Sequence, residues 1–133
     1  MSFALRGAES GIRAPEGRDA PESVTVPGAR LDDWCATHAC RPSLLKIDVE
    51  GGEAAILRGG AEILAETRPV ILCEVLTDEA GEAVAAALPV DYLCFEIDEN
   101  KGPRLRDRPS RRVWRHYNWW LVPAEQRDEA IDW

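Results

Sequence analysis

A change of period between residues 43 and 57 constrains the fold of this chain more than any other feature. Over residues 43–50 (SLLKIDVE), apolar side chains alternate with charged ones, as they do in a strand with one buried face. Gly51 and Gly52 end this run, and from there the apolar residues recur at helical spacing. We therefore expect a strand that turns through glycine directly into a helix, which is the building unit of an α/β sheet.

The flanking pattern repeats strand and helix. A short β-prone run over 23–26 precedes helical spacing over 31–39, and Gly59 and Gly60 are expected to split the helix after the first strand into two. Residues 70–76 (VILCEVL) are almost uniformly apolar, which is typical of a parallel strand covered on both faces by helices. The expected class is therefore α/β with a parallel sheet.

The C-terminal third continues the alternation with a different ending. Residues 78–88 predict an alanine-rich helix that Pro89 terminates, and residues 92–98 predict a half-buried strand nearer an edge. A polar, arginine-rich loop is expected over 99–115, and most such charge runs are solvated. The loop leads to a last strand over 117–122, which a hairpin connection would make antiparallel to its predecessor.

Composition sets the class of protein. At 133 residues, with 45% hydrophobic and 30% charged residues, the chain predicts a single soluble globular unit. No apolar run approaches the roughly 18 residues of a membrane-spanning helix, and the N-terminus has no secretory-signal pattern, so we expect a cytoplasmic protein with no membrane contact. A net charge of −8 argues against a nucleic-acid partner and favours small substrates.

The four cysteines have a structural interpretation. Cys73 and Cys94 lie inside apolar, strand-like runs, where cysteine serves as a small buried hydrophobe rather than a disulfide partner. Cys35 and Cys40 have no second close pair and no histidine at a zinc spacing, so they are interpreted as structural thiols.

Residues 44–64 (LLKIDVEGGEAAILRGGAEIL) resemble the signature of the FkbM-family S-adenosylmethionine-dependent methyltransferases, in which a strand ending in K-I-D-V-E-G runs into a helix carrying Glu and then L-x-G. The flanks agree: RLDDW at 30–34, RPVILCEV at 68–75 and NWWLVP at 118–123 resemble the family's neighbouring elements. Together these matches span residues 24–123.

The resemblance implies a Rossmann-like class I methyltransferase fold. The glycine-rich turn and the acidic strand end that hold the cofactor in the first half of that fold have no counterpart in this sequence. The resemblance therefore implies a truncated fold of strands four to seven, with the last strand antiparallel. We expect residues 24–133 to form this C-terminal half and residues 1–23 to form an irregular or mobile arm.

The implied activity is transfer of a methyl group from S-adenosyl-L-methionine to a hydroxyl on a small metabolite or sugar. The alternative is a non-catalytic remnant or partner subunit that keeps only the second half of the fold. In either case the sheet edge beside strand four is open, so we expect a homo-oligomer or an N-terminal partner to cover it.

Four residues are candidates for the site: Asp48, Glu50, Glu74 and His116. In open parallel sheets, ligands bind outside the carboxyl ends of strands, which is where the three acids fall. Asp48 is the leading candidate for a general base that takes the hydroxyl proton, and His116 precedes the last strand and can reach the same cleft. The acids could instead hold a divalent cation, or cap a helix and bond backbone amides, the role we favour for Glu53; we assign no metal.

Several neighbours have a structural interpretation. Lys46 faces the same side as Asp48, which favours a salt bridge between them. Gly51 and Gly52 are interpreted as providing tolerance of positive φ at the turn. Trp119 and Trp120 must face opposite sides of their strand.

Overall fold

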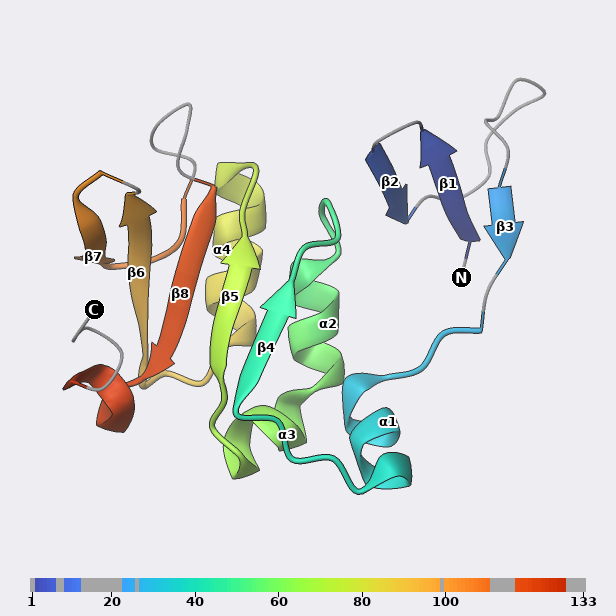
Figure 1. Cartoon of the computed structure of the whole chain (residues 1–133), viewed down its shortest axis with the longest axis horizontal. Coiled ribbons are helices and arrows are strands. Elements are labelled where there is room, and N and C mark those ends of the chain that lie inside the picture. Colours follow the sequence, from blue (N-terminus) through green and yellow to red (C-terminus); the bar gives the residue numbers. More distant parts are fainter. Residues whose placement is uncertain are drawn as a thin grey trace.

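The chain's structure is a computed structural model, and it describes residues 2–6, 9–12, 23–25, 27–98, 100–110 and 117–128, with backbone alone for the first three ranges. A five-stranded mixed sheet forms its centre (Figure 1). From one edge to the other the strands are β4 (Leu44–Ile47), β5 (Val70–Glu74), β8 (Asn118–Pro123), β6 (Tyr92–Asp98) and β7 (Gly102–Arg106).

The strand directions confirm the mixed α/β class. β4 and β5 are parallel, with Ile47 opposite Cys73. The last strand, β8, lies between β5 and β6 and is antiparallel to both, as expected for the closing strand. Because β8 opposes both neighbours, β4, β5 and β6 all end at the same edge of the sheet.

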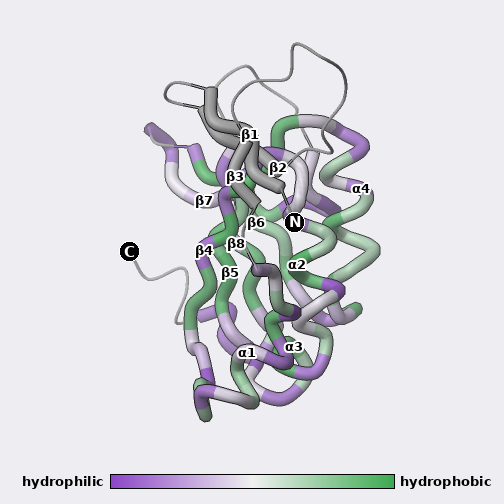
Figure 2. The backbone as a smooth tube through the Cα atoms, turned by 90° about the vertical axis from the view of Figure 1, so that its right-hand side faces the viewer, coloured by the Kyte–Doolittle hydropathy of each residue, from purple (hydrophilic) through white to green (hydrophobic). Residues whose placement is uncertain are grey.

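The four described α-helices are α1 (Leu31–His38), α2 (Glu53–Gly59), α3 (Ala61–Glu66) and α4 (Asp78–Ala87), and a 3-10 helix, η1 (Ala124–Gln126), follows β8. Three of the four, α2, α3 and α4, lie on one face of this sheet, and α1 lies beyond its β4 edge against α2 and α3 (Figures 1 and 2). The break between α2 and α3 falls at Gly60, as predicted. A side chain there would meet Leu31 of α1, since a Cβ built on Gly60 lies 2.6 Å from the Leu31 Cδ2.

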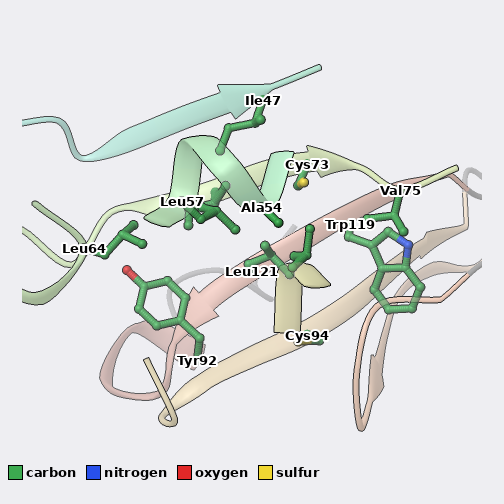
Figure 3. Close-up of a cluster of buried hydrophobic side chains, with 12 residues drawn as sticks. Ile47, Ala54, Leu57, Leu64, Cys73, Val75, Tyr92, Cys94, Trp119 and Leu121 are labelled. Carbon is green, nitrogen blue, oxygen red and sulfur yellow. The ribbon is translucent and has the colours of Figure 1, made fainter. Parts of the chain in front are cut away.

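The core lies between the helices and this face of the sheet (Figure 3). Leu57, Ile71, Trp119 and Leu121 are among its fully buried side chains. Trp120 is only half-buried and its side chain alternates to the other face, so the prediction that the two tryptophans face opposite sides is confirmed.

The prediction that residues 70–76 are covered by helices on both faces is wrong for the described residues. Ile71 and Cys73 are buried, whereas Val70, Leu72 and Glu74 on the opposite face are half-buried. The described α-helices that cover the sheet, α2, α3 and α4, lie on the first face. The uniform apolarity of the run did not distinguish one covered face from two.

The predicted loop over 99–115 contains a strand. β7 pairs antiparallel with β6, and Gly102 adopts a φ of +75° where the two strands connect. Arg106 donates to the buried carboxylate of Glu96 at 2.8 Å. This arginine therefore has a structural role that the polarity of the segment did not predict. Residues 111–116 lie outside the described residues.

The N-terminal segment also differs from the irregular arm predicted over residues 1–23. Its described parts form a three-stranded antiparallel sheet in the order β2 (Glu9–Ile12), β1 (Ser2–Arg6), β3 (Ser23–Thr25). The strands are short and rich in small residues, so no apolar period marked the first two, whereas the β-prone run over 23–26 was predicted.

An ion-pair network joins the elements at the amino edge of the central sheet. Arg68, just before β5, donates to both carboxylate oxygens of Asp91 (2.9 and 2.6 Å) and to both of Glu125 (2.8 Å each). Its guanidinium lies 5.0 Å from the ring centroid of Tyr92, whose hydroxyl donates to the carbonyl of Pro69 at 3.0 Å. This network ties the starts of β5 and β6 to the end of β8.

Candidate active site

Two carboxyl groups meet at the carboxyl edge of the parallel strands. Asp48 directly follows β4 and Glu74 is the last residue of β5. Because the two strands are parallel and in register, these ends lie side by side, and the charge of Asp48 acts on Glu74. We refer to Asp48 and Glu74 as the carboxyl pair.

The surroundings of the pair raise the pKa of Glu74. Burial is the largest cause, followed by the negative charge of Asp48 and the hydrogen bond with it, and then by the charges of Glu50 and Glu53. The Nζ of Lys46 lies 3.1 Å from the Asp48 Oδ2, which confirms the predicted salt bridge. The acids that raise the pKa of Glu74 lie where a ligand has access, since the Asp48 side chain is about half exposed.

The turn after the pair is held in an unusual backbone shape. Glu50 has a φ of +51° and Gly51 a φ of +107°, a conformation that favours glycine. A Cβ built on Gly51 meets nothing within 4 Å, so the glycine serves the backbone angle, as predicted. At Gly52 the same expectation is wrong, because its φ is −101°.

Glu53 has the structural role favoured above. Its side chain is buried, and its Oε1 accepts the N–H of Gly51 at 2.9 Å. The bond fixes the turn on which Glu50 stands. Glu50 itself is exposed, and its charge contributes to the raised pKa of Glu74.

A groove of about 920 Å³ opens beside this turn. Trp34 on α1 supplies its aromatic wall, is 47% exposed, and stacks on His38 at 4.3 Å between ring centroids. The groove is lined by Pro27, Gly28, Ala29, Arg30, Leu31, Trp34, Glu50, Gly51, Gly52, Ala55, Ile56 and Gly59. Glu50 therefore lies between the groove and the carboxyl pair.

The structure brings together three of the four predicted site residues, and His116 lies outside the described residues. Two further residues of this region were not assigned a clear role from sequence. Asn118 faces Glu74 across the β5–β8 ladder, and Trp34 lines the groove. The helical spacing of Trp34 suggested a core residue, and nothing in the sequence marked it as exposed.

The alternative of a cation site finds no geometric support in the part of the chain that the structure describes. No group of three or more histidine, cysteine, aspartate or glutamate side chains there has the arrangement of a metal site. Within the same residues, no helix is both long and apolar enough to cross a membrane.

The comparison with protein families decides the lineage. The model of the FkbM methyltransferase domain matches residues 3–102. The chain belongs to the FkbM methyltransferase family. The match begins at residue 3 and therefore includes the N-terminal strands β1, β2 and β3. No curated protein and no solved structure matches the chain.

Membership gives the carboxyl pair its context. The K-I-D-V-E-G segment that carries the resemblance contains Lys46, Asp48, Glu50 and Gly51. These are the residues at the end of β4, in the turn and beside the groove. The family therefore implies a methyltransferase. The candidate site coincides with the K-I-D-V-E-G segment, which is the part of the sequence most specific to the family.

Proposed function

We propose that this FkbM-family chain transfers a methyl group from S-adenosyl-L-methionine to a hydroxyl of a small metabolite or sugar. The observation that carries the proposal is the carboxyl pair at the ends of two parallel strands. A hydroxyl that gains a methyl group must lose its proton, and the methyl on a sulfonium needs no acid to activate it. One positioned base is therefore the main chemical requirement.

The carboxyl pair meets this requirement. Asp48 is accessible enough to accept a hydrogen bond from the acceptor hydroxyl, and Lys46 holds its orientation. Glu74, whose pKa is raised, ends the strand beside Asp48 and is a second acid placed to accept the hydroxyl proton as the new O–C bond forms. Asn118, opposite Glu74 on β8, is exposed beside the pair and is suited to orient the acceptor through its amide.

The groove beside the turn fits parts of the cofactor. The exposed indole of Trp34 offers a stacking surface for the adenine, and Gly51 and Gly52 let a ligand approach the backbone closely. The charge of Glu50 and of the carboxyl pair attracts the positive sulfonium. When bound there, S-adenosyl-L-methionine would supply the activated methyl group.

The fold supports a finer assignment. We propose that β4, β5, β6 and β8 correspond to strands four to seven of a class I, Rossmann-like methyltransferase sheet. In support, β4 and β5 are parallel and the closing strand is antiparallel.

The test is calorimetric titration of the purified chain with S-adenosyl-L-methionine, combined with a radiolabelled methyl-transfer assay on a panel of hydroxylated sugars and metabolites. Binding together with transfer to a hydroxyl supports the proposal. Absence of heat up to millimolar ligand would reject catalysis by this chain on its own. Transfer that persists unchanged in Asp48→Asn would reject the base assignment.

The open edge of β4 supports a second candidate function, that of a partner subunit without catalysis of its own. β4 pairs only with β5 in the described sheet, and Leu44 on it is 63% exposed. Free strand edges with apolar flanks are normally covered. We therefore expect a second copy, or an N-terminal segment of methyltransferase fold, to pair with this edge.

Sedimentation equilibrium tests this expectation. A self-associating chain should become monomeric when Leu44→Lys places a charge on the edge, whereas Leu105→Lys, at another exposed apolar residue, on β7, should leave association unchanged. A monomer at all concentrations would reject pairing with a second copy. Equal effects of the two substitutions would reject the β4 edge as the interface.

A further inference from the structure

The end of α1 brings two cysteines together in a way that the methyl-transfer site does not use. Ala39 adopts a left-handed φ of +50°, its N–H donates to the Ala36 carbonyl at 3.4 Å, and the Cys40 N–H donates to the Cys35 carbonyl at 2.9 Å. These two bonds define a Schellman motif, in which the residues joined by the outer bond commonly have side chains in contact. Here both of those residues are cysteines.

The side chains follow this geometry. Cys35 and Cys40 line one pocket of about 370 Å³. Cys35 is almost fully buried, whereas Cys40 is partly exposed. Both are free cysteines, so neither is part of a disulfide.

We propose that Cys35 and Cys40 form an oxidisable dithiol site that closes to an intrachain disulfide in exchange with a low-molecular-weight disulfide such as oxidised glutathione. The more accessible Cys40 sulfur, as thiolate, attacks the glutathione disulfide and releases one glutathione. The Cys35 sulfur, after losing its proton, then attacks the Cys40 sulfur and releases the second glutathione. Two electrons pass from the protein thiols to glutathione disulfide, and the two thiol protons end on the two reduced glutathiones.

The environment sets the order of the two steps. Burial, followed by the neighbouring Cys40 and Asp32, raises the pKa of the Cys35 thiol, so this thiol stays protonated at neutral pH and resolves rather than begins the exchange. Cys73 and Cys94 are buried in separate strands with pKa values raised to about 12 and about 11, and they serve as internal controls.

The sequence makes the test direct. Trypsin does not cleave the Arg41–Pro42 or Arg68–Pro69 bonds, so residues 31–46 form one peptide with Cys35 and Cys40, and residues 59–101 form another with Cys73 and Cys94. The folded chain is equilibrated with oxidised and reduced glutathione, quenched in acid, alkylated under denaturing conditions, digested and weighed. The same equilibration in urea gives the unfolded reference.

We expect peptide 31–46 to lose two hydrogens and escape alkylation, with peptide 59–101 alkylated twice. The disulfide fraction of peptide 31–46 should be higher in the folded chain than in urea, Cys40→Ser should abolish it, and Cys73→Ser should leave it unchanged. Two alkylated thiols in peptide 31–46 at every glutathione ratio would overturn the proposal. So would a glutathione adduct that never resolves, or an equal disulfide fraction in urea.

Discussion

At the amino edge of the central sheet, Arg68 pairs with two acids, whereas at the carboxyl edge of the same sheet, Glu74 lies beside other acids. Arg68 holds Asp91 and Glu125 at 2.6–2.9 Å and lowers the pKa of both carboxyl groups. At the other edge, burial and neighbouring acids raise the pKa of Glu74. The same strands carry both arrangements.

The difference separates stability from function. Paired charges at the amino edge lower the free energy of the folded state, and they leave no group ready to react. Acids held close together at the carboxyl edge cost stability and gain a proton affinity nearer neutral pH, which is the property of a general base. We therefore expect substitutions at the two edges to have opposite consequences.

The largest expected effect is on methyl transfer. Asp48→Asn and Glu74→Gln should each lower the rate by about 100-fold or more, because each removes half of the base. The free energy of unfolding should stay within about 0.5 kcal/mol of the wild-type value or rise, since the lost Lys46 bridge is exposed and an acid repulsion is relieved. Rate measurements beside urea unfolding check both parts, with the exposed Glu66→Gln as the matched control.

The amino edge should respond in the reverse sense. Arg68→Ala should lower the free energy of unfolding by about 2 kcal/mol, because it leaves two acids facing each other and removes the cation over Tyr92. Arg68→Lys should recover only part of this, since lysine cannot bind two carboxylates through a planar fork. Urea unfolding measures the change, and a loss below about 0.5 kcal/mol for Arg68→Ala would contradict the stabilising role.

The pH dependence of stability should have opposite signs at the two edges. Glu125 has a pKa lowered to about 2 from its ordinary 4.5, so its contribution is complete above pH 4.5 and is lost as the pH falls toward 2. Glu74 has a raised pKa, so the folded state is favoured below 4.5 and loses stability as the pH rises through the folded pKa.

Urea unfolding across pH checks the two signs separately. Glu125→Gln should flatten the acidic slope alone, and Glu74→Gln should remove the loss on the higher-pH side alone. If both substitutions changed the same limb of the curve, the contrast between the edges would be wrong.

The smallest effect is expected at the turn. Gly51→Ala should cost about 1 kcal/mol, because alanine is strained at a φ of +107° although its methyl group meets nothing. Ala55→Gly, on the exposed side of the neighbouring helix α2, is the comparison for a change of similar size without that strain. A stability gain for Gly51→Ala in urea unfolding would show that the angle is not maintained.

The sequence predicted the carboxyl edge well and the amino edge hardly at all. The alternation of apolar residues over 43–50 and the apolar run over 70–76 predicted two parallel strands. Parallel strands place Asp48 and Glu74 side by side at their carboxyl ends. Local pattern carries that information. The partners of Arg68 lie 23 and 57 residues away, so no local pattern reveals them.

Two other features escaped prediction for physical reasons. β7 is an edge strand whose middle residues are exposed, and its Arg106 pairs with Glu96 of β6, so its polar sequence resembles a loop. Trp34 sits at helical spacing, but its neighbours on α1 and the turn beyond β4 leave it open to the groove, which only the tertiary arrangement determines.

The central claim is that Asp48 and the neighbouring acids raise the pKa of Glu74, and carbon-13 NMR titration of the glutamate side-chain carboxyls tests it most directly. The account predicts that Glu74 titrates above the ordinary glutamate range in the wild-type chain and moves back toward that range in Asp48→Asn. Titration of Glu74 at the ordinary value in both proteins would contradict it.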